Sequence, residues 1–244
     1  MAIAKYKQLF QYAEQVSPYL KGRIGIADHQ HISAAHGNPE LLNTLYQHWK
    51  SAHPEAGNPY WLTRSWTMLA WQPLYIAFIG VYALRSIPPL RNIAQDYKQG
   101  VVAGFHLQGD NWYTGTEDEL IEYACAQLAM LLDELHCQFN QHNRLRPGLT
   151  KPLIADAILE ALVQRQSLMT EQQACEKTNQ EIDNDIVRHA TMWLSHLGLP
   201  LRHLDALQKD EQSGRWQVKR ISCCMHYRRH DGELCDNCPR QQDK

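Results

Sequence analysis

The sequence lacks the motifs by which many redox enzymes bind a nucleotide cofactor. No predicted strand is followed by Gly-x-Gly-x-x-Gly, and no glycine-rich loop ends in Gly-Lys-Ser or Gly-Lys-Thr. The Gly-x-Ser-x-Gly turn of many serine hydrolases is absent as well. If this protein transfers electrons, a centre of another kind must therefore carry them.

A strong excess of charge of either sign is also lacking. The 24 Lys and Arg residues nearly balance the 26 Asp and Glu residues, for a net charge of −2, so we expect no nucleic-acid partner. Residues 1–7 lack the apolar core and the small-residue cleavage site of a signal peptide. We therefore expect a cytoplasmic protein, in a compartment where thiols stay reduced.

Long apolar runs are absent with one exception, the uncharged residues 65–84. A run of this length could just cross a bilayer. However, Pro73 lies in its middle, polar side chains interrupt it and no second run follows. We expect buried helices over residues 60–71 and 74–84, divided or kinked at Pro73. A transmembrane helix and a peripheral contact with a membrane are the alternatives.

Most of the remaining chain places apolar residues at helical spacing. Helix starts are marked by Asn38-Pro39 and by a capping box that begins at Thr116. The expected helices span residues 4–16, 39–51, 116–142, 153–165 and 182–197, with a short one at 200–207.

Strand signals are few. Residues 101–107 and 111–114 predict a β-hairpin with its turn at 108–110, and residues 215–221 alternate like a strand. Residues 21–37 are expected to be irregular. The predicted fold class is therefore α+β and mainly α-helical.

The chain is expected to have two parts that pack as one unit. Residues 1–213 would form a mainly helical body with a small β-hairpin, and residues 214–244 a cysteine-rich C-terminal segment. No internal repeat or low-complexity stretch subdivides the body further.

Cysteine is scarce except near the C-terminus. Of the seven cysteines, four lie within sixteen residues. Thiols spaced this closely form disulfides, a zinc site or an iron–sulfur cluster. The clustered cysteines are Cys223, Cys224, Cys235 and Cys238, and those expected to be small buried residues are Cys125, Cys137 and Cys175.

The spacing favours an iron–sulfur cluster and leaves zinc open. A reducing compartment disfavours disulfides. Zinc sites usually pair their ligands as two short Cys-x-x-Cys-like units, and only Cys235 and Cys238 have that spacing. The side chains of Cys223 and Cys224 diverge, so they reach the two irons of a cluster more easily than one zinc ion. Basic residues outnumber acidic ones around these cysteines. Their positive charge would stabilise a reduced, anionic cluster. The alternative is that these basic residues form only a solvated tail.

A second group of candidate metal ligands lies near the N-terminus. His29, His31 and His36 are close in sequence to Asp28. No cysteine or carboxylate pattern completes a defined site there, so we expect these histidines to be solvated or hydrogen-bonded.

The C-terminal pattern Cys-Cys-x₁₀-Cys-x₂-Cys resembles that of the FhuF-like ferric-siderophore reductases. Tyr227-Arg228 after the paired cysteines and Asp236-Asn237 between the last two share this resemblance. The aromatic block from Trp61 to Pro73 is similar to the siderophore-iron-reductase branch of that family. The resemblance implies one-electron reduction of siderophore-bound Fe(III) to Fe(II), which releases iron in the cytoplasm. It also implies a 2Fe–2S cluster on Cys223, Cys224, Cys235 and Cys238.

The same resemblance implies partners and a substrate site. The substrate would be a ferric siderophore of the hydroxamate type, and the electron donor a protein such as a ferredoxin. Aromatic residues at helical spacing are also typical of a plain core. A zinc- or cluster-stabilised binding or regulatory module without turnover is the alternative function. The side chains expected to line the substrate site are Arg64, Trp66, Trp71, Tyr75 and Arg228.

Overall fold

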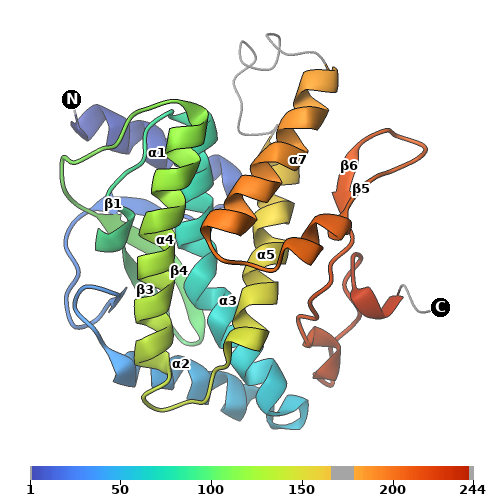
Figure 1. The fold of residues 1–244 in the computed structure, drawn as a ribbon. Helices are drawn as coiled ribbons and strands as arrows, with labels where there is room; N and C mark the ends of the chain where they lie inside the picture. Colours follow the sequence, from blue (N-terminus) through green and yellow to red (C-terminus); the bar gives the residue numbers. More distant parts are fainter. Residues whose placement is uncertain (1, 166–178, 242–244) are drawn as a thin grey trace.

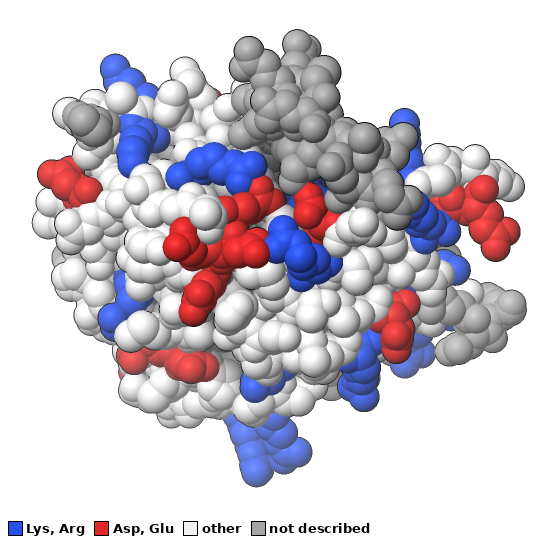
Figure 2. Space-filling view, turned by 45° about the horizontal axis from the view of Figure 1, so that its top comes forward, with Lys and Arg blue, Asp and Glu red and all other residues white. Residues whose placement is uncertain are grey.

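The computed structural model describes residues 2–165 and 179–241. Helices dominate, a small sheet lies beside them, and an irregular C-terminal segment carries the clustered cysteines (Figure 1). The α+β, mainly α-helical prediction is therefore confirmed. On the face in Figure 2, basic and acidic side chains are interspersed, in keeping with the small net charge.

The helix α3 (Gly57–Phe78) runs through the centre of the molecule and packs against several other helices. Two of its neighbours, α2 and α4, begin where the sequence predicts. The Asn38 side chain caps α2 by accepting from the Leu41 N–H, and Thr116 and Glu119 form a capping box on α4. The remaining helices are α1 (Ala2–Val16), α2 (Pro39–Ala52), α4 (Glu117–Phe139), α5 (Pro147–Gln164) and α7 (Asn179–His196).

Of the two predicted outcomes at Pro73, a division into two helices is wrong, because α3 continues through this residue. A proline leaves the carbonyl four residues earlier without its helical donor. Here that carbonyl belongs to Leu69, and the Gln95 side-chain amide donates to it at 3.0 Å. Gln72 in turn donates to the Gln95 side chain at 3.0 Å, so a buried amide pair replaces the missing helical bond. The helix then passes into a π-helical turn, η2 (Ile79–Ala83).

The uncharged run is buried by protein. Within residues 2–165 and 179–241, no helix combines the length and apolarity needed to cross a membrane. Leu69 and Ile76 of α3 are both fully buried, because α2, α4 and α5 pack around this helix.

The sheet differs from the predicted hairpin. Its strand order is β1-β4-β3-β2, with β1 parallel to β4 and the other pairs antiparallel. β4 pairs with β3 through a tight turn at Gln99-Gly100, where both residues have positive φ, and not with residues 111–114. Tyr113 forms only an isolated bridge with Ile87. Because β1 and β2 fall within residues 21–37, the expectation that this stretch is irregular is wrong for these two strands. The strands are β1 (Gly22–Ile24), β2 (Ile32–Ser33), β3 (Ala94–Lys98) and β4 (Val101–Leu107).

Several element limits and one burial prediction need correction. α5 begins at Pro147 and contains Pro152, whereas the expected helix began at residue 153. Cys125 is buried as expected, but Cys137 is exposed on α4, and Cys175 lies outside the described residues. The remaining elements are short: η1 (Pro54–Ala56), η3 (Leu90–Asn92), η5 (Leu201–Ala206), β5 (Leu207–Lys209), β6 (Trp216–Val218), η6 (His226–Arg228) and η7 (Pro239–Gln241).

Buried His189 of α7 should make stability depend on pH. Burial and the guanidinium groups of Arg165 and Arg188 lower its pKa to about 3, and the carboxylates of Asp185 and Asp118 offset only part of this. In the unfolded chain this histidine has a pKa of about 6.5. Below that pH the unfolded state therefore binds a proton that the folded state does not bind. We therefore expect the free energy of unfolding to fall by up to ~1.4 kcal/mol per pH unit as the pH decreases from about 6.5 towards 3.

Urea unfolding of wild type and of His189→Gln between pH 7.5 and 5 measures this dependence. The variant should be less stable at pH 7.5 and should show a shallower loss of stability on acidification. A matched substitution of the exposed His36, His36→Gln, should retain the wild-type slope. Equal slopes in wild type and His189→Gln would show that His189 is not the responsible group.

Candidate metal centre

Tight turns shape the segment that carries the clustered cysteines. Met225 adopts a left-handed backbone conformation with φ of 60°, and its N–H lies 3.4 Å from the Cys223 sulfur. Gly232 closes the next turn, where an added Cβ would lie 2.0 Å from the carbonyl oxygen of His226. A side chain is therefore excluded at this position. A third turn, closed by a 2.9 Å bond from the Cys238 N–H to the Cys235 carbonyl, joins the last two cysteines.

These turns bring the two ends of the cysteine motif together. The sulfurs of Cys224 and Cys235 lie 3.5 Å apart, and both residues are free thiols. A disulfide requires about 2.05 Å. Two thiolates on one tetrahedral ion at about 2.3 Å lie roughly 3.7 Å apart, so the observed spacing suits metal ligation. Cys238 is buried, whereas Cys223, Cys224 and Cys235 are half-buried.

Burial and nearby charges determine the electrostatics of these thiols. Burial and the adjacent Cys224 thiol raise the pKa of Cys235 to about 12, while Arg220 acts in the opposite direction. The Arg220 guanidinium interacts electrostatically with both Cys224 and Cys235. Cys235 therefore stays protonated at neutral pH without a metal, and a bound metal would displace this proton.

A buried carboxylate fixes the chain just before the cysteines. Asp156 of α5 is fully buried and accepts hydrogen bonds from the Ser222 N–H at 2.7 Å and from the Ser222 hydroxyl. It also accepts from the buried ring of His203 at 2.8 Å and from the Ile221 N–H at 3.4 Å. Sequence reasoning missed this anchor, although a lone carboxylate among the apolar residues of α5 was a visible signal.

Two further contacts hold the segment on the body. The Asn237 side chain donates to Glu160 of α5 at 2.7 Å. On the other side, the His230 N–H donates to Glu55 of η1 at 3.1 Å. Figure 1 shows the segment beside α5, well apart from the four-stranded sheet.

Three of the five predicted substrate residues lie along one side of α3. Arg64 and Trp71 line a surface hollow of about 390 Å³ together with residues of β4. The Trp71 indole N–H donates to the Val102 carbonyl at 2.8 Å, and Tyr75 lies next to Trp71 with ring centroids 6.4 Å apart. The spacing of 64, 71 and 75 places these side chains on one stripe of the helix.

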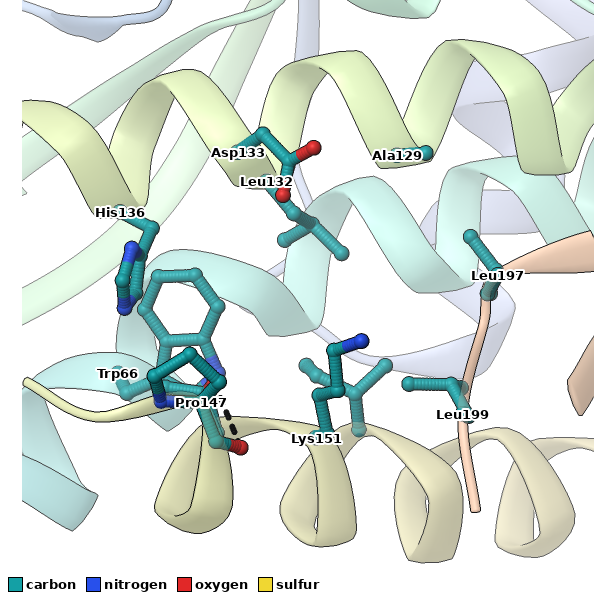
Figure 3. Close-up of a pocket in the computed structure, with 11 residues that line it drawn as sticks. Trp66, Ala129, Leu132, Asp133, His136, Pro147, Lys151, Leu197 and Leu199 are labelled. Atoms are coloured by element: carbon teal, nitrogen blue, oxygen red, sulfur yellow. Dashed lines mark hydrogen bonds between the residues drawn. The ribbon is translucent and has the colours of Figure 1, made fainter. Parts of the chain in front are cut away.

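The other two predicted substrate residues lie elsewhere. Trp66 is only 3% exposed and points to the far side of α3, into a hollow between α4 and α5 that His136 also lines (Figure 3). Arg228 is exposed on η6, and its guanidinium lies near Gly57 at the start of α3. The structure therefore groups Arg64, Trp71 and Tyr75 and separates Trp66 from them.

Positive charge is concentrated where α3 meets the cysteine segment. Arg64 is half-buried, lies 5.0 Å from the Trp49 ring centre and is close enough to Cys224 to interact with its thiolate charge. Arg229 interacts with Tyr60 and pairs with Asp231 at 2.9 Å. Within the described residues, none of the ion pairs involves Arg64.

Comparison with known proteins identifies this segment. Residues 220–240 match the family described as the FhuF 2Fe-2S C-terminal domain. Together with the clustered free thiols, this match defines an iron–sulfur protein whose cofactor is a 2Fe–2S cluster. The match confirms the resemblance to the FhuF-like ferric-siderophore reductases. Residues 1–219 lie outside the match, and no solved structure matches the chain significantly.

Proposed function

We propose that this protein is a cytoplasmic ferric-siderophore reductase. The observation that carries the proposal is the FhuF-type 2Fe-2S segment, anchored beside the half-buried Arg64 of α3. The body (residues 1–213) would dock the substrate, and the segment (residues 214–244) would hold the cluster. The shared contacts of Asp156, Glu160 and Glu55 support packing of both parts as one unit.

In this proposal all four clustered cysteines are cluster ligands. Thiolates are the usual ligands of a 2Fe–2S cluster, and the short distance between Cys224 and Cys235 joins the two halves of the motif. When bound, the cluster supplies a single electron. Arg220 and Arg64 lie near the thiols and stabilise the added negative charge. The ligand set is Cys223, Cys224, Cys235 and Cys238.

The hollow beside α3 is our proposed contact site for one face of a ferric hydroxamate. Trp71 lines this hollow and offers apolar surface, Tyr75 lies next to Trp71, and the Arg64 guanidinium can donate hydrogen bonds to the oxygen ligands of iron. The guanidinium of Arg228 on η6 lies near Gly57, at the start of α3, and would contact a more exposed part of the complex. These oxygens suit Fe(III) better than Fe(II), so one added electron weakens the complex and the chelator need not be cleaved.

A small acidic redox protein such as a ferredoxin is our proposed electron donor. Arg228, Arg229 and Arg240 lie in or beside the cysteine segment and would attract it. Each turnover then balances as one electron in from the donor and one electron out to Fe(III).

Single-turnover reduction tests the proposed function. Cluster-loaded protein is reduced anaerobically, freed of excess reductant and mixed with a ferric trihydroxamate and a colorimetric ferrous chelator. We expect about one Fe(II) per reduced cluster, together with return of the oxidised visible spectrum. If the yield of Fe(II) is no higher than in the protein-free control, the result favours a binding or regulatory module without turnover.

An arginine variant tests the proposed dock under multiple turnover, with an electron donor in excess and the concentration of the ferric hydroxamate varied. Arg64→Gln should raise the KM for the ferric hydroxamate about tenfold or more, because it removes a charged hydrogen-bond donor. The matched control is Arg91→Gln, which replaces an exposed arginine on η3 and should leave the KM unchanged. Equal KM values for Arg64→Gln and wild type would place the substrate elsewhere.

A further inference from the structure

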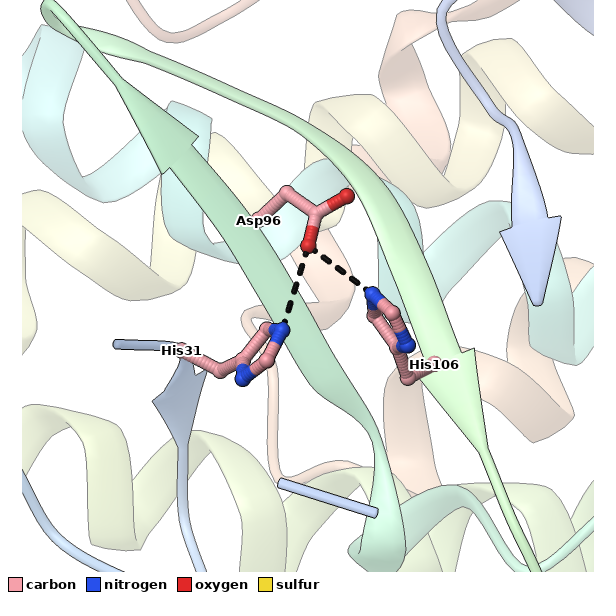
Figure 4. A group of neighbouring side chains, drawn as sticks. All are labelled: His31, Asp96 and His106. Atoms are coloured by element: carbon pink, nitrogen blue, oxygen red, sulfur yellow. Dashed lines mark hydrogen bonds and ion pairs between the residues drawn. The ribbon is translucent and has the colours of Figure 1, made fainter. Parts of the chain in front are cut away.

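The sheet brings two histidines and one aspartate together on one of its sides (Figure 4). His31 lies directly before β2, Asp96 lies in β3 and His106 lies in β4. Their potential ligand atoms all lie within 4.8 Å of one another. All three residues are partly buried, with side-chain exposures of 17%, 32% and 16%.

The spacing of these atoms suits a metal ion. The Asp96 Oδ1 atom lies 3.4 Å from His31 Nε2 and 3.0 Å from His106 Nε2. Ligand atoms bonded to one transition ion at about 2.1 Å, with angles of roughly 90° to 110°, lie about 3.0–3.4 Å apart. The present spacing would therefore need little adjustment to accept an ion.

The His31 ring lies between two carboxylates. Its Nδ1 faces the Asp28 Oδ1 atom at 2.7 Å, while its Nε2 faces the Asp96 Oδ1 atom. A neutral imidazole carries only one N–H and can satisfy only one of these carboxylates. A ring that donates from Nδ1 to Asp28 leaves its Nε2 free to bind a metal ion, and Asp96 Oδ1 can then accept from His106 Nε2. A carboxylate behind a ligating histidine is the usual arrangement in metal sites.

The backbone is shaped to place the Asp96 carboxylate. The pairing of β3 with β4 is irregular between Gln95 and Tyr97, so Asp96 lies at a bulge that redirects its side chain. Opposite it, Gly104 has a φ of +93°, and an added Cβ would lie 2.5 Å from the Asp96 Oδ2 atom. Glycine therefore leaves the space that this carboxylate occupies. Arg23 lies 3.7 Å from the same Oδ2 atom and leaves Oδ1 to the two histidines.

We propose that His31, Asp96 and His106 bind one divalent first-row transition ion. The ligand atoms are His31 Nε2, His106 Nε2 and Asp96 Oδ1, and Asp28 orients His31. Two imidazoles favour ions such as Zn²⁺ or Fe²⁺ over Mg²⁺ or Ca²⁺, and three protein ligands leave positions for water. From the sequence alone, His31 was expected to be solvated or hydrogen-bonded, because Asp96 and His106 come from distant strands. This site is separate from the cysteine segment and does not depend on the proposed reductase activity.

Calorimetric titration with Zn²⁺ tests the site. The protein is used with its 2Fe–2S cluster in place, so that the cysteines are occupied, and the titration is repeated anaerobically with Fe²⁺. We expect one additional ion per chain. Asp96→Asn and His106→Gln should weaken Zn²⁺ binding more than a hundredfold, and Asp28→Asn should weaken it about tenfold. The matched control His29→Gln replaces an exposed histidine of the same loop and should stay within twofold of wild type.

Folding of each variant is checked by the visible spectrum of the cluster and by thermal unfolding. Zn²⁺ should raise the Tm of wild type and of His29→Gln but not that of Asp96→Asn. Absence of an additional Zn²⁺ in wild type, or wild-type affinity in both Asp96→Asn and His106→Gln, would overturn the proposal and leave a hydrogen-bonded His–Asp–His group. The readout is metal binding alone, so either result leaves the reductase assay unaffected.

Discussion

Replacing Cys224 by serine is expected to abolish the visible absorption of the 2Fe–2S cluster and to reduce the iron content from about two per chain to nearly zero. Cys224 is the thiol that meets Cys235 at 3.5 Å, so its loss separates the two halves of the motif. Serine is a harder and less acidic ligand and does not replace a thiolate on iron at neutral pH. Absorption spectra, iron analysis and the bleaching of colour by dithionite measure the effect.

The same experiment has a matched control within the chain. Cys137 is an exposed free thiol on α4, away from the cysteine segment. Cys137→Ser should retain the full colour and the two irons of wild type. If Cys224→Ser retained two irons and an unchanged spectrum, Cys224 could not be a ligand, and the proposed ligand set would be wrong.

The isosteric substitution Asp156→Asn is expected to lower the free energy of unfolding by about 3 kcal/mol. Asp156 is fully buried and accepts from both the N–H and the hydroxyl of Ser222 and from the His203 ring. An amide can replace one acceptor oxygen, but its NH₂ group would face another donor. The chain that leads into Cys223 should therefore loosen, and the cluster should be lost faster to a chelator.

Urea unfolding and the rate of bleaching by an iron chelator measure these two effects. The control is Asp205→Asn, which makes the same chemical change at an exposed position on η5 and should alter stability by less than about 0.5 kcal/mol. Wild-type stability and wild-type bleaching in Asp156→Asn would show that the buried carboxylate does not anchor the segment.

Local sequence signals predicted the helices well. The Asn38 cap and the Thr116 capping box lie within a few residues of the helix ends that they set, so both were readable from the sequence. Pro73 misled the prediction because its missing bond is replaced by Gln95, a residue from another element. The hairpin prediction also failed, because the turn at Gln99-Gly100 lacks the more typical Asn-Gly or Asp-Gly pair.

The candidate site residues also divide into those that a local pattern predicts and those that only long-range contacts bring together. The clustered cysteines were found from spacing alone, since they lie close together along the chain. Asp156 was missed because its partner Ser222 lies 66 residues away. Asp96 and His106 meet His31 only when the sheet forms, and such long-range pairs leave no local pattern.

The contact between Asp156 and Ser222 also bears on how the protein matures. Closing a loop of this length costs conformational entropy, which packing of the body must offset before the bond can persist. Cys223 follows Ser222 directly, so the thiols take up their arrangement only after α5 has packed. We therefore expect insertion of the cluster to be coupled to folding of the helical body, which holds the chain next to the first cysteine.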